Sequence, residues 1–110
     1  KVKMNFQHIN QLDSEIVKRL KPLKPLRIIL FGSFAYGEPN ENSDIDICIV
    51  KENVKSKIEE KRKARKLLKG LPIAKDILVP SKEEYNFYKK EYGSVYRDID
   101  KKGKLLWPHI

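Results

Sequence analysis

Four short apolar runs constrain the fold of this chain more than any other feature of its sequence. Each is rich in β-branched, leucine or aromatic residues, and each is too short to form a buried helix or to cross a membrane. Three of them are bounded at both ends by proline or glycine, which interrupt regular structure. We predict that the four runs are strands, at 26–31, 45–50, 73–79 and 104–107.

Helical patterns occupy the segments between the runs. Apolar residues recur at helical spacing over about 10–21, where prolines end the pattern. Ser81, with Glu84 three residues later, forms a capping box that predicts a helix after it, and a shorter helix is predicted over 94–102. A single helical turn is expected after Ser33. Strands that alternate with helices predict an α/β (α+β) domain with a small mixed sheet of about four strands.

The segment 51–69 carries nine basic residues and three glutamates. Its apolar stripe is thin and consists of Val54, Ile58 and Leu68, so we expect a helix that is mostly exposed to solvent. Such a charge run is more often a solvated face than a nucleic-acid site. Its functional interpretation is docking of an acidic partner or of RNA phosphates.

Length and charge narrow the class of protein. The 110 residues predict a single domain over 1–110. A balance of 24 Lys plus Arg against 15 Asp plus Glu gives a net charge of +9, which favours an anionic partner such as a nucleotide, a nucleic acid or an acidic protein. With a single cysteine, no membrane-spanning run and no visible secretory signal, we expect a cytoplasmic protein.

Three aspartates stand in or beside two of the predicted strands, where charged residues are unusual. Asp44 and Asp46 flank Ile45, and alternation along a strand projects both carboxylates from one face. Their mutual repulsion needs a cation, and Mg²⁺ takes carboxylate oxygens while leaving positions for substrate phosphates. Asp76 lies inside the third predicted strand, where a buried carboxylate is usually paired or metal-bound. Three such carboxylates can hold two metal ions for an in-line phosphoryl displacement.

A glycine and a serine, Gly32 and Ser33, follow the first predicted strand, twelve residues before the acidic pair. A glycine lets a phosphate approach the backbone closely, and the serine offers a hydroxyl. Free N–H groups at the start of a helix attract anions. We therefore predict a triphosphate-binding turn at this position.

The stretch GSFAYGEPNENSDIDICIV resembles the G-S-x10-D-x-D signature of the DNA polymerase beta-like nucleotidyltransferase superfamily. Gly32, Ser33, Asp44 and Asp46 are in register with this signature, and Asp76 in IAKDILV matches the third acid. The chain is most similar to the minimal nucleotidyltransferases, the MNT family, from its first helix to its closing strand. The resemblance implies a nucleotidyltransferase fold like that of the polymerase beta palm.

An activity and a partner are also implied by this resemblance. In the MNT family the Gly-Ser pair holds the β and γ phosphates, the first two aspartates bind two Mg²⁺ ions, and the third binds one metal and helps to activate the acceptor hydroxyl. Many members are antitoxins that transfer AMP from ATP to a tyrosine of a HEPN toxin, a helical ribonuclease encoded beside them. We expect such a partner to complete the acceptor site.

Two positions depart from the family pattern. Many relatives have a basic residue where this chain has Phe34 or Tyr36, so a Lys or Arg elsewhere would have to compensate in binding the triphosphate. The weaker cradle motivates one alternative, an inactive antitoxin that masks its partner stoichiometrically. The charge of +9 motivates another, a small nucleic-acid-binding module.

Several site residues also have purely structural interpretations. Ser33 can be an N-cap, Asp44 a loop-to-strand cap, Asp46 an edge-strand charge, and Asp76 can pair with Lys75.

The remaining notable side chains are expected in the core or at contacts. Cys48 is predicted to pack as a small buried hydrophobe beside the site. Tyr85, Tyr88 and Tyr92 are expected on one helix face, as core or as a subunit interface, and Trp107 suggests burial or contact.

Overall fold

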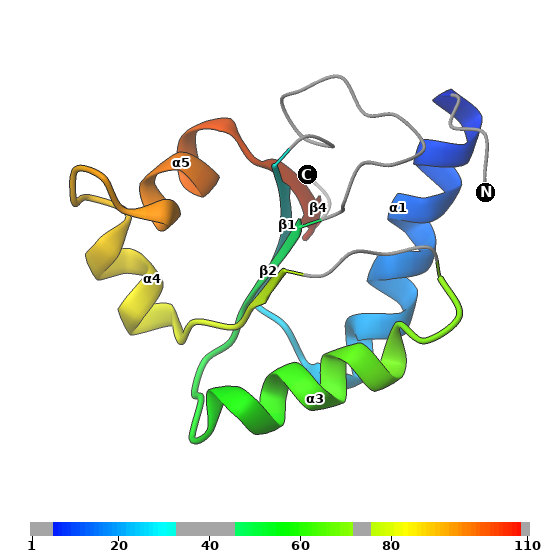
Figure 1. The fold of residues 1–110 in the computed structure, drawn as a ribbon, viewed down its shortest axis with the longest axis horizontal. Coiled ribbons are helices and arrows are strands. Elements are labelled where there is room, and N and C mark those ends of the chain that lie inside the picture. Colours follow the sequence, from blue (N-terminus) through cyan, green and yellow to red (C-terminus); the bar gives the residue numbers. More distant parts are fainter. Residues whose placement is uncertain (1–5, 33–45, 72–75, 109–110) are drawn as a thin grey trace.

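The computed structural model describes residues 6–32, 46–71 and 76–108, with side chains from residue 11 onward. Three layers make up this part of the chain, and the central one is a sheet that Figure 1 shows edge-on. One face of the sheet is covered by α1 (Phe6–Leu20) and α3 (Lys57–Leu67), and the other by α4 (Lys82–Tyr88) and α5 (Val95–Lys102). A short 3-10 helix, η1 (Lys21–Leu23), follows α1.

Within the described ranges the sheet is mixed and has four strands in the order β3-β2-β1-β4. β1 pairs antiparallel with both β2 and β4, whereas β2 and β3 are parallel. The strands are β1 (Arg27–Phe31), β2 (Asp46–Val50), β3 (Ile77–Leu78) and β4 (Lys104–Trp107). The predicted fold class and number of strands are therefore confirmed.

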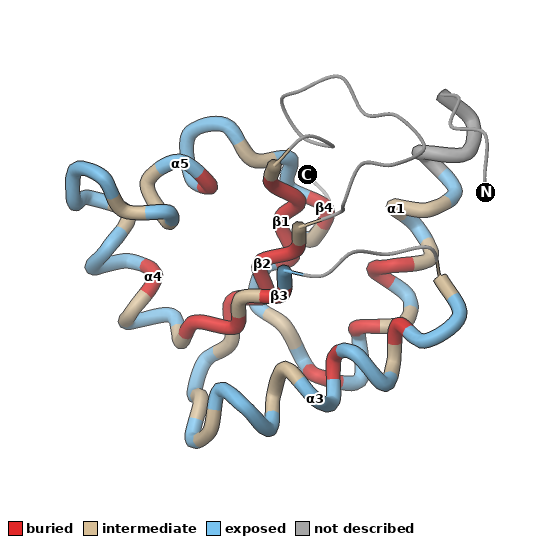
Figure 2. The backbone as a smooth tube through the Cα atoms, in the orientation of Figure 1, coloured by how far each residue is buried: buried red, intermediate tan, exposed pale blue. Residues whose placement is uncertain are grey.

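Side chains that alternate along the two central strands fill two separate cores. Ile28, Leu30, Ile47 and Ile49 pack toward α1 and α3. The intervening residues, Ile29, Phe31, Cys48 and Val50, pack toward Tyr85 of α4 and Ile99 of α5. Figure 2 shows this buried band along the middle of the fold. Burial on both faces explains why the first two runs contain few polar residues.

The basic helix begins later than its charge pattern predicts. Lys51 extends β2 by one bridge to Ser81, and its N–H donates to the Pro80 carbonyl at 3.1 Å. α3 then starts after Ser56, whose hydroxyl accepts from the Glu59 N–H at 3.3 Å.

The predicted apolar stripe of this helix was partly wrong. Ile58 is 70% exposed, whereas Leu68 is buried and Val54 packs against the core, as predicted. Ala64, which was not part of the predicted stripe, is also buried in this core. Most of α3 is solvated, as expected.

The tyrosine stripe was also predicted only in part. Ser81 caps α4, because its hydroxyl accepts from the Glu84 N–H at 3.1 Å. The helix ends at Tyr88, however, so Tyr92 lies beyond it and is 90% exposed. Tyr85 alone of the three is in the core, where its hydroxyl donates to Asp100 at 3.1 Å. The helical turn expected after Ser33 lies outside the described residues.

Candidate active site

The end of β1 and the start of β2 bring two of the predicted site residues together. Phe31, the last residue of β1, pairs with Asp46, the first residue of β2. Gly32 follows Phe31 directly, so it lies beside Asp46 at this end of the sheet.

The Asp46 carboxylate packs directly against the backbone of Gly32. A Cβ atom placed on Gly32 would overlap the Asp46 carboxylate, with Oδ2 as its nearest neighbour. Gly32 also has a φ of +78°, in the left-handed region that side chains disfavour. Both observations require glycine at position 32. Gly32 therefore has a structural reason to be glycine in addition to its predicted role in binding phosphate.

A third predicted residue joins the pair through the parallel pairing of β2 with β3. Ile47 pairs with Ile77, so the register carried back by one residue places Asp76 beside Asp46. The Ile47 N–H donates to the Asp76 carbonyl at 2.9 Å, which fixes this neighbourhood. Adjacent positions in a parallel pair project their side chains from the same face of the sheet. The fold therefore places Asp76, directly before β3, beside Asp46 of β2, with both side chains on one face.

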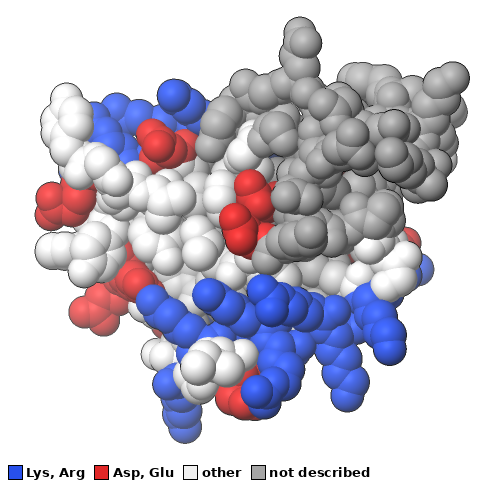
Figure 3. Space-filling model, viewed as in Figure 1, with Lys and Arg blue, Asp and Glu red and all other residues white. Residues whose placement is uncertain are grey.

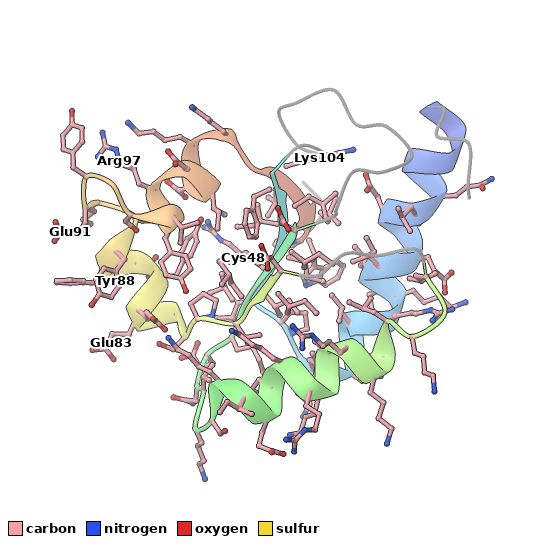
Figure 4. The ribbon with its side chains drawn as sticks, in the orientation of Figure 1. Cys48, Glu83, Tyr88, Glu91, Arg97 and Lys104 are labelled. Carbon is pink, nitrogen blue, oxygen red and sulfur yellow. The ribbon has the colours of Figure 1, made fainter. Side chains whose placement is uncertain are left out.

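That face is the one covered by α4 and α5. Asp46 shares it with Cys48, two residues further along β2, and Asp76 shares it with Leu78 of β3. Figure 4 labels Cys48 near the middle of the sheet. In Figure 3 acidic side chains lie beside the residues that are not described, whereas the basic side chains gather over α3. Because α3 covers the opposite face, its charge is separated from the acids by the sheet.

The sequence predicted Asp76 inside the third strand, and this prediction was wrong. β3 consists of Ile77–Leu78 within the described residues, and Asp76 precedes it with an exposed side chain. β3 is also the outermost strand on its side of the sheet, so no further described strand covers it. The Asp76 carboxylate is therefore open to a molecule that approaches from solvent.

Ser33 and Asp44 lie outside the described residues, as do Phe34, Tyr36 and Lys75. Within the described ranges, no group of three or more His, Cys, Asp or Glu side chains forms a metal cluster. Asp46 and Asp76 nevertheless supply neighbouring carboxylate oxygens, which are the donors that Mg²⁺ prefers. This donor chemistry fits a magnesium ion and is unsuited to a soft metal.

Cys48 packs as the sequence predicted. Its side chain is fully buried, and burial, with a smaller effect of the Glu84 charge, raises the pKa of the thiol from 9.0 to about 12. A thiol with such a pKa stays protonated and unreactive at neutral pH. Trp107 is half-buried against the core, and Lys21 Nζ lies 4.8 Å from the centre of its ring.

Sequence reasoning missed the end of α5 as part of this region. A Cβ on Gly103 would overlap the Ile99 carbonyl oxygen and the Ile29 side chain, so α5 joins β4 in close contact with β1. The first residue of β4 after this junction, Lys104, pairs with Leu30 of β1. A Lys-Lys-Gly sequence before a strand was the signal that could have indicated it.

Comparison with known families agrees with this fold. The family model described as a nucleotidyltransferase domain matches residues 13–106. The chain belongs to the nucleotidyltransferase family. It is a transferase, and the predicted family, activity class and fold are confirmed.

Two archaeal proteins are similar to this nucleotidyltransferase, and both come from Methanocaldococcus jannaschii. Each is named "Putative protein adenylyltransferase". The first is 34% identical over 101 residues, which cover 92% of this chain and 92% of that protein. The second is 38% identical over 53 residues, which cover 48% of this chain and 52% of that protein.

A solved structure shares the fold of this nucleotidyltransferase. It is the crystal structure of a mutant toxin–antitoxin pair, MntA-HpeT, and it aligns with a TM-score of 0.59 and 24% identity. The alignment covers 86% of this chain and 72% of the matched chain. Among the described residues, no helix of the nucleotidyltransferase is long and apolar enough to cross a membrane.

Proposed function

We propose that this nucleotidyltransferase transfers AMP from ATP to a hydroxyl group of a partner protein, and that it acts as the antitoxin of a toxin–antitoxin pair. The observation that carries the proposal is the placement of Asp46 and Asp76 side by side, with Gly32 against the Asp46 carboxylate. The name of the first relative supports a protein acceptor, and the fold shared with MntA-HpeT supports the antitoxin role.

In the proposed mechanism, Gly32 and Ser33 bind the β and γ phosphates of ATP. The missing side chain at position 32 leaves backbone N–H groups accessible to phosphate oxygens. Asp44, Asp46 and Asp76 would hold two Mg²⁺ ions. When bound, Mg²⁺ neutralises phosphate charge and polarises the α phosphate.

Asp76 has a second role in this proposal. Its exposed carboxylate accepts the proton of the acceptor hydroxyl as the hydroxyl oxygen attacks the α phosphorus. A bond forms between that oxygen and the α phosphorus, and the anhydride bond to the β phosphate breaks. Pyrophosphate leaves with the bonding electrons. An exposed base suits an acceptor that belongs to another protein, because such a residue must arrive from solvent.

The proposed acceptor is a tyrosine of a HEPN-type helical partner. Tyrosine presents a hydroxyl on a long, rigid side chain, which suits a site whose described acids lie at the start of β2 and directly before β3. In this proposal one chain supplies the three acids and binds the nucleotide, and the partner supplies the acceptor.

Label transfer from ATP tests the proposal. The protein is incubated with ATP labelled at the α phosphate, Mg²⁺ and the product of its neighbouring gene. We expect label on the partner with the wild type, and a loss of at least a hundredfold with Asp46→Asn or Asp76→Asn. Asp98→Asn is the matched control, because Asp98 is an exposed aspartate on α5 with no proposed role. The proposal is wrong if the partner stays unlabelled, or if the two site variants transfer as well as the control.

The same variants distinguish an antitoxin that acts by AMP transfer from one that masks its partner stoichiometrically. If Asp46→Asn neutralises the partner's toxicity as well as the wild type does, binding alone accounts for the antitoxin role. We expect neutralisation to be lost together with label transfer.

A further inference from the structure

We propose that the exposed face of α3 binds the phosphate backbone of duplex DNA. This inference goes beyond the proposed AMP transfer and does not depend on it. The segment 55–69, which contains α3, carries eight basic residues against two acidic ones, so it holds most of the net charge of +9. Seven of these eight bases are exposed. Figure 3 shows basic side chains gathered over α3.

The two acids of this segment do little to neutralise the exposed face. The side chain of Glu60 is only 13% exposed, and its carboxylate pairs with Lys51, directly after β2, at 2.6 Å. Glu59 pairs with Arg62 at 2.6 Å, but both side chains are more than half exposed. Such an exposed pair is screened by water and salt and contributes little. A polyanion can therefore compete for Arg62.

The bases near the end of α3 are not needed to hold the fold together. Neither Lys66 nor Lys69 forms an ion pair with a residue that the structure describes. Bases in a last turn can offset the partial negative charge of the final carbonyls. Here Arg19 of α1 does so, because its Nη1 donates to the Lys69 carbonyl at 2.6 Å. Lys18, in the same last turn of α1, is exposed, so the basic surface continues past α3.

Helical geometry points the central bases away from the core. Ala64 is fully buried and marks the inner side of α3. Arg62 and Lys66 stand two residues before and after it, so both project from the opposite side, separated by about 6 Å along the axis. Duplex DNA carries one negative charge per about 1.7 Å of its axis. Each of these bases can therefore meet a separate phosphate.

The composition of this face favours nucleic acid over a protein partner. Protein interfaces are depleted in lysine and enriched in aromatic residues. The segment 55–69 contains six lysines, two arginines and no aromatic residue. Exposed aromatic side chains lie instead at Phe87 and Tyr88 of α4 and at Tyr92 after it. Because α4 covers the other face of the sheet, these aromatic residues and the basic face of α3 are separate surfaces.

The same composition favours a DNA duplex over RNA or a single strand. Proteins that bind single strands stack the bases on aromatic side chains, which this segment lacks. The major groove of B-form DNA admits an α-helix, whereas that of A-form RNA is too narrow for side chains to read. In Figure 1 α3 lies at the outer edge of the fold, so a duplex can approach it from solvent. Bound DNA would leave the face that carries Asp46 and Asp76 open.

Salt-dependent DNA binding tests the inference. Fluorescence anisotropy of the full chain uses two labelled 20-base-pair DNA duplexes of unrelated sequence, in 50–200 mM KCl. We expect equal affinity for the two duplexes, since phosphates carry no sequence information. A variant that combines Arg62→Gln, Lys66→Gln and Lys69→Gln should bind about a hundredfold more weakly at 100 mM KCl. Its slope of log affinity against log salt should be smaller by about 2–3, because each lost phosphate contact removes about 0.9.

A control variant removes the same charge from the other face of the sheet. It combines Lys82→Gln, Lys90→Gln and Lys101→Gln, at exposed positions on or beside α4 and α5. This variant should bind DNA like the wild type. An equal loss for the two variants would show that net charge alone causes the binding, and would overturn the inference.

The remaining outcomes separate other ligands from duplex DNA. The inference is overturned if the wild type binds no DNA, which would make α3 a solvated face, or if it binds duplex RNA or a single strand more tightly. It is also overturned if the α3 variant keeps its DNA affinity but no longer labels the partner, because α3 would then dock a protein. DNA binding by a wild type that labels no partner would refute the proposed function alone.

Discussion

The contact between Gly32 and Asp46 allows one substitution to test the structural basis of the site. In Gly32→Ala the new methyl group meets two obstacles. A φ of +78° costs an L residue about 1–2 kcal/mol, and the methyl group overlaps the Asp46 carboxylate. The carboxylate is the far end of a side chain and can move, so we expect the protein to fold while Asp46 is displaced.

Gly93→Ala provides the control for this experiment. Gly93 has the same φ of +78°, but a Cβ there would meet nothing within 4 Å. Both variants should lose about 1–2 kcal/mol of unfolding free energy, which corresponds to a melting temperature lower by about 5–10 °C for a domain of this size. Gly32→Ala alone should lose transfer activity by about a hundredfold, because displacing a reacting group by about 1 Å has this effect.

Thermal unfolding and label transfer, measured on the same preparations, test whether Gly32→Ala acts on the position of Asp46 or on stability. The reasoning about Gly32 is refuted if Gly32→Ala transfers AMP as well as Gly93→Ala does. It is also refuted if Gly32→Ala loses activity only in proportion to its unfolded fraction, because the loss would then come from stability and not from the position of Asp46.

Three further predictions concern stability. Ser81→Ala removes the cap of α4 and should lower the unfolding free energy by about 1 kcal/mol in a urea titration, and an unchanged midpoint would contradict the capping role. Ile58→Ser should change the unfolding free energy by no more than about 0.5 kcal/mol, whereas Leu68→Ala should lower it by about 3 kcal/mol. Similar losses for the two variants would show that Ile58 is part of the buried stripe, as the sequence predicted. Burial raises the pKa of Cys48 from 9.0 to about 12, so the folded state holds this proton more tightly than the unfolded state. The corresponding stability is complete below pH 9 and falls as the pH rises toward 12; Cys48→Ala should flatten that slope in alkaline unfolding, and a slope identical to the wild type would show that the tyrosines alone cause it.

The strands and most helices could be predicted because their signals are local. Prolines and glycines mark the ends of β1 and β4, and these strands begin and end within a residue of the predicted positions. Ser81 caps α4 through a hydrogen bond that spans three residues, so a short stretch of sequence suffices to predict it. The predicted start of α3 was wrong because Lys51 forms a long-range bridge to Ser81. A local sequence pattern does not reveal such a bridge.

The exposure of side chains on the helices was harder to predict than the helices themselves. Ile58 and Ala64 both fit a helical pattern, but only the second meets the core that α1 and the sheet build around it. Tyr92 fits the spacing of Tyr85, yet α4 ends before reaching it. Helical spacing indicates which residues share a face, and it does not indicate how far the helix or its neighbours extend.

By itself the sequence determined the family of this protein and the residues proposed for its chemistry, because the Gly-Ser and Asp-x-Asp spacing is a local pattern. Only the tertiary structure decided how Asp76 meets Asp46 and why position 32 must be glycine. Those relations come from strand pairing between residues that are separated in the sequence, as between Phe31 and Asp46 or between Ile47 and Ile77. Pairing register depends on the whole sheet, so the exposure of Asp76, directly before an outer strand, followed from the strand order and not from its apolar neighbours in sequence.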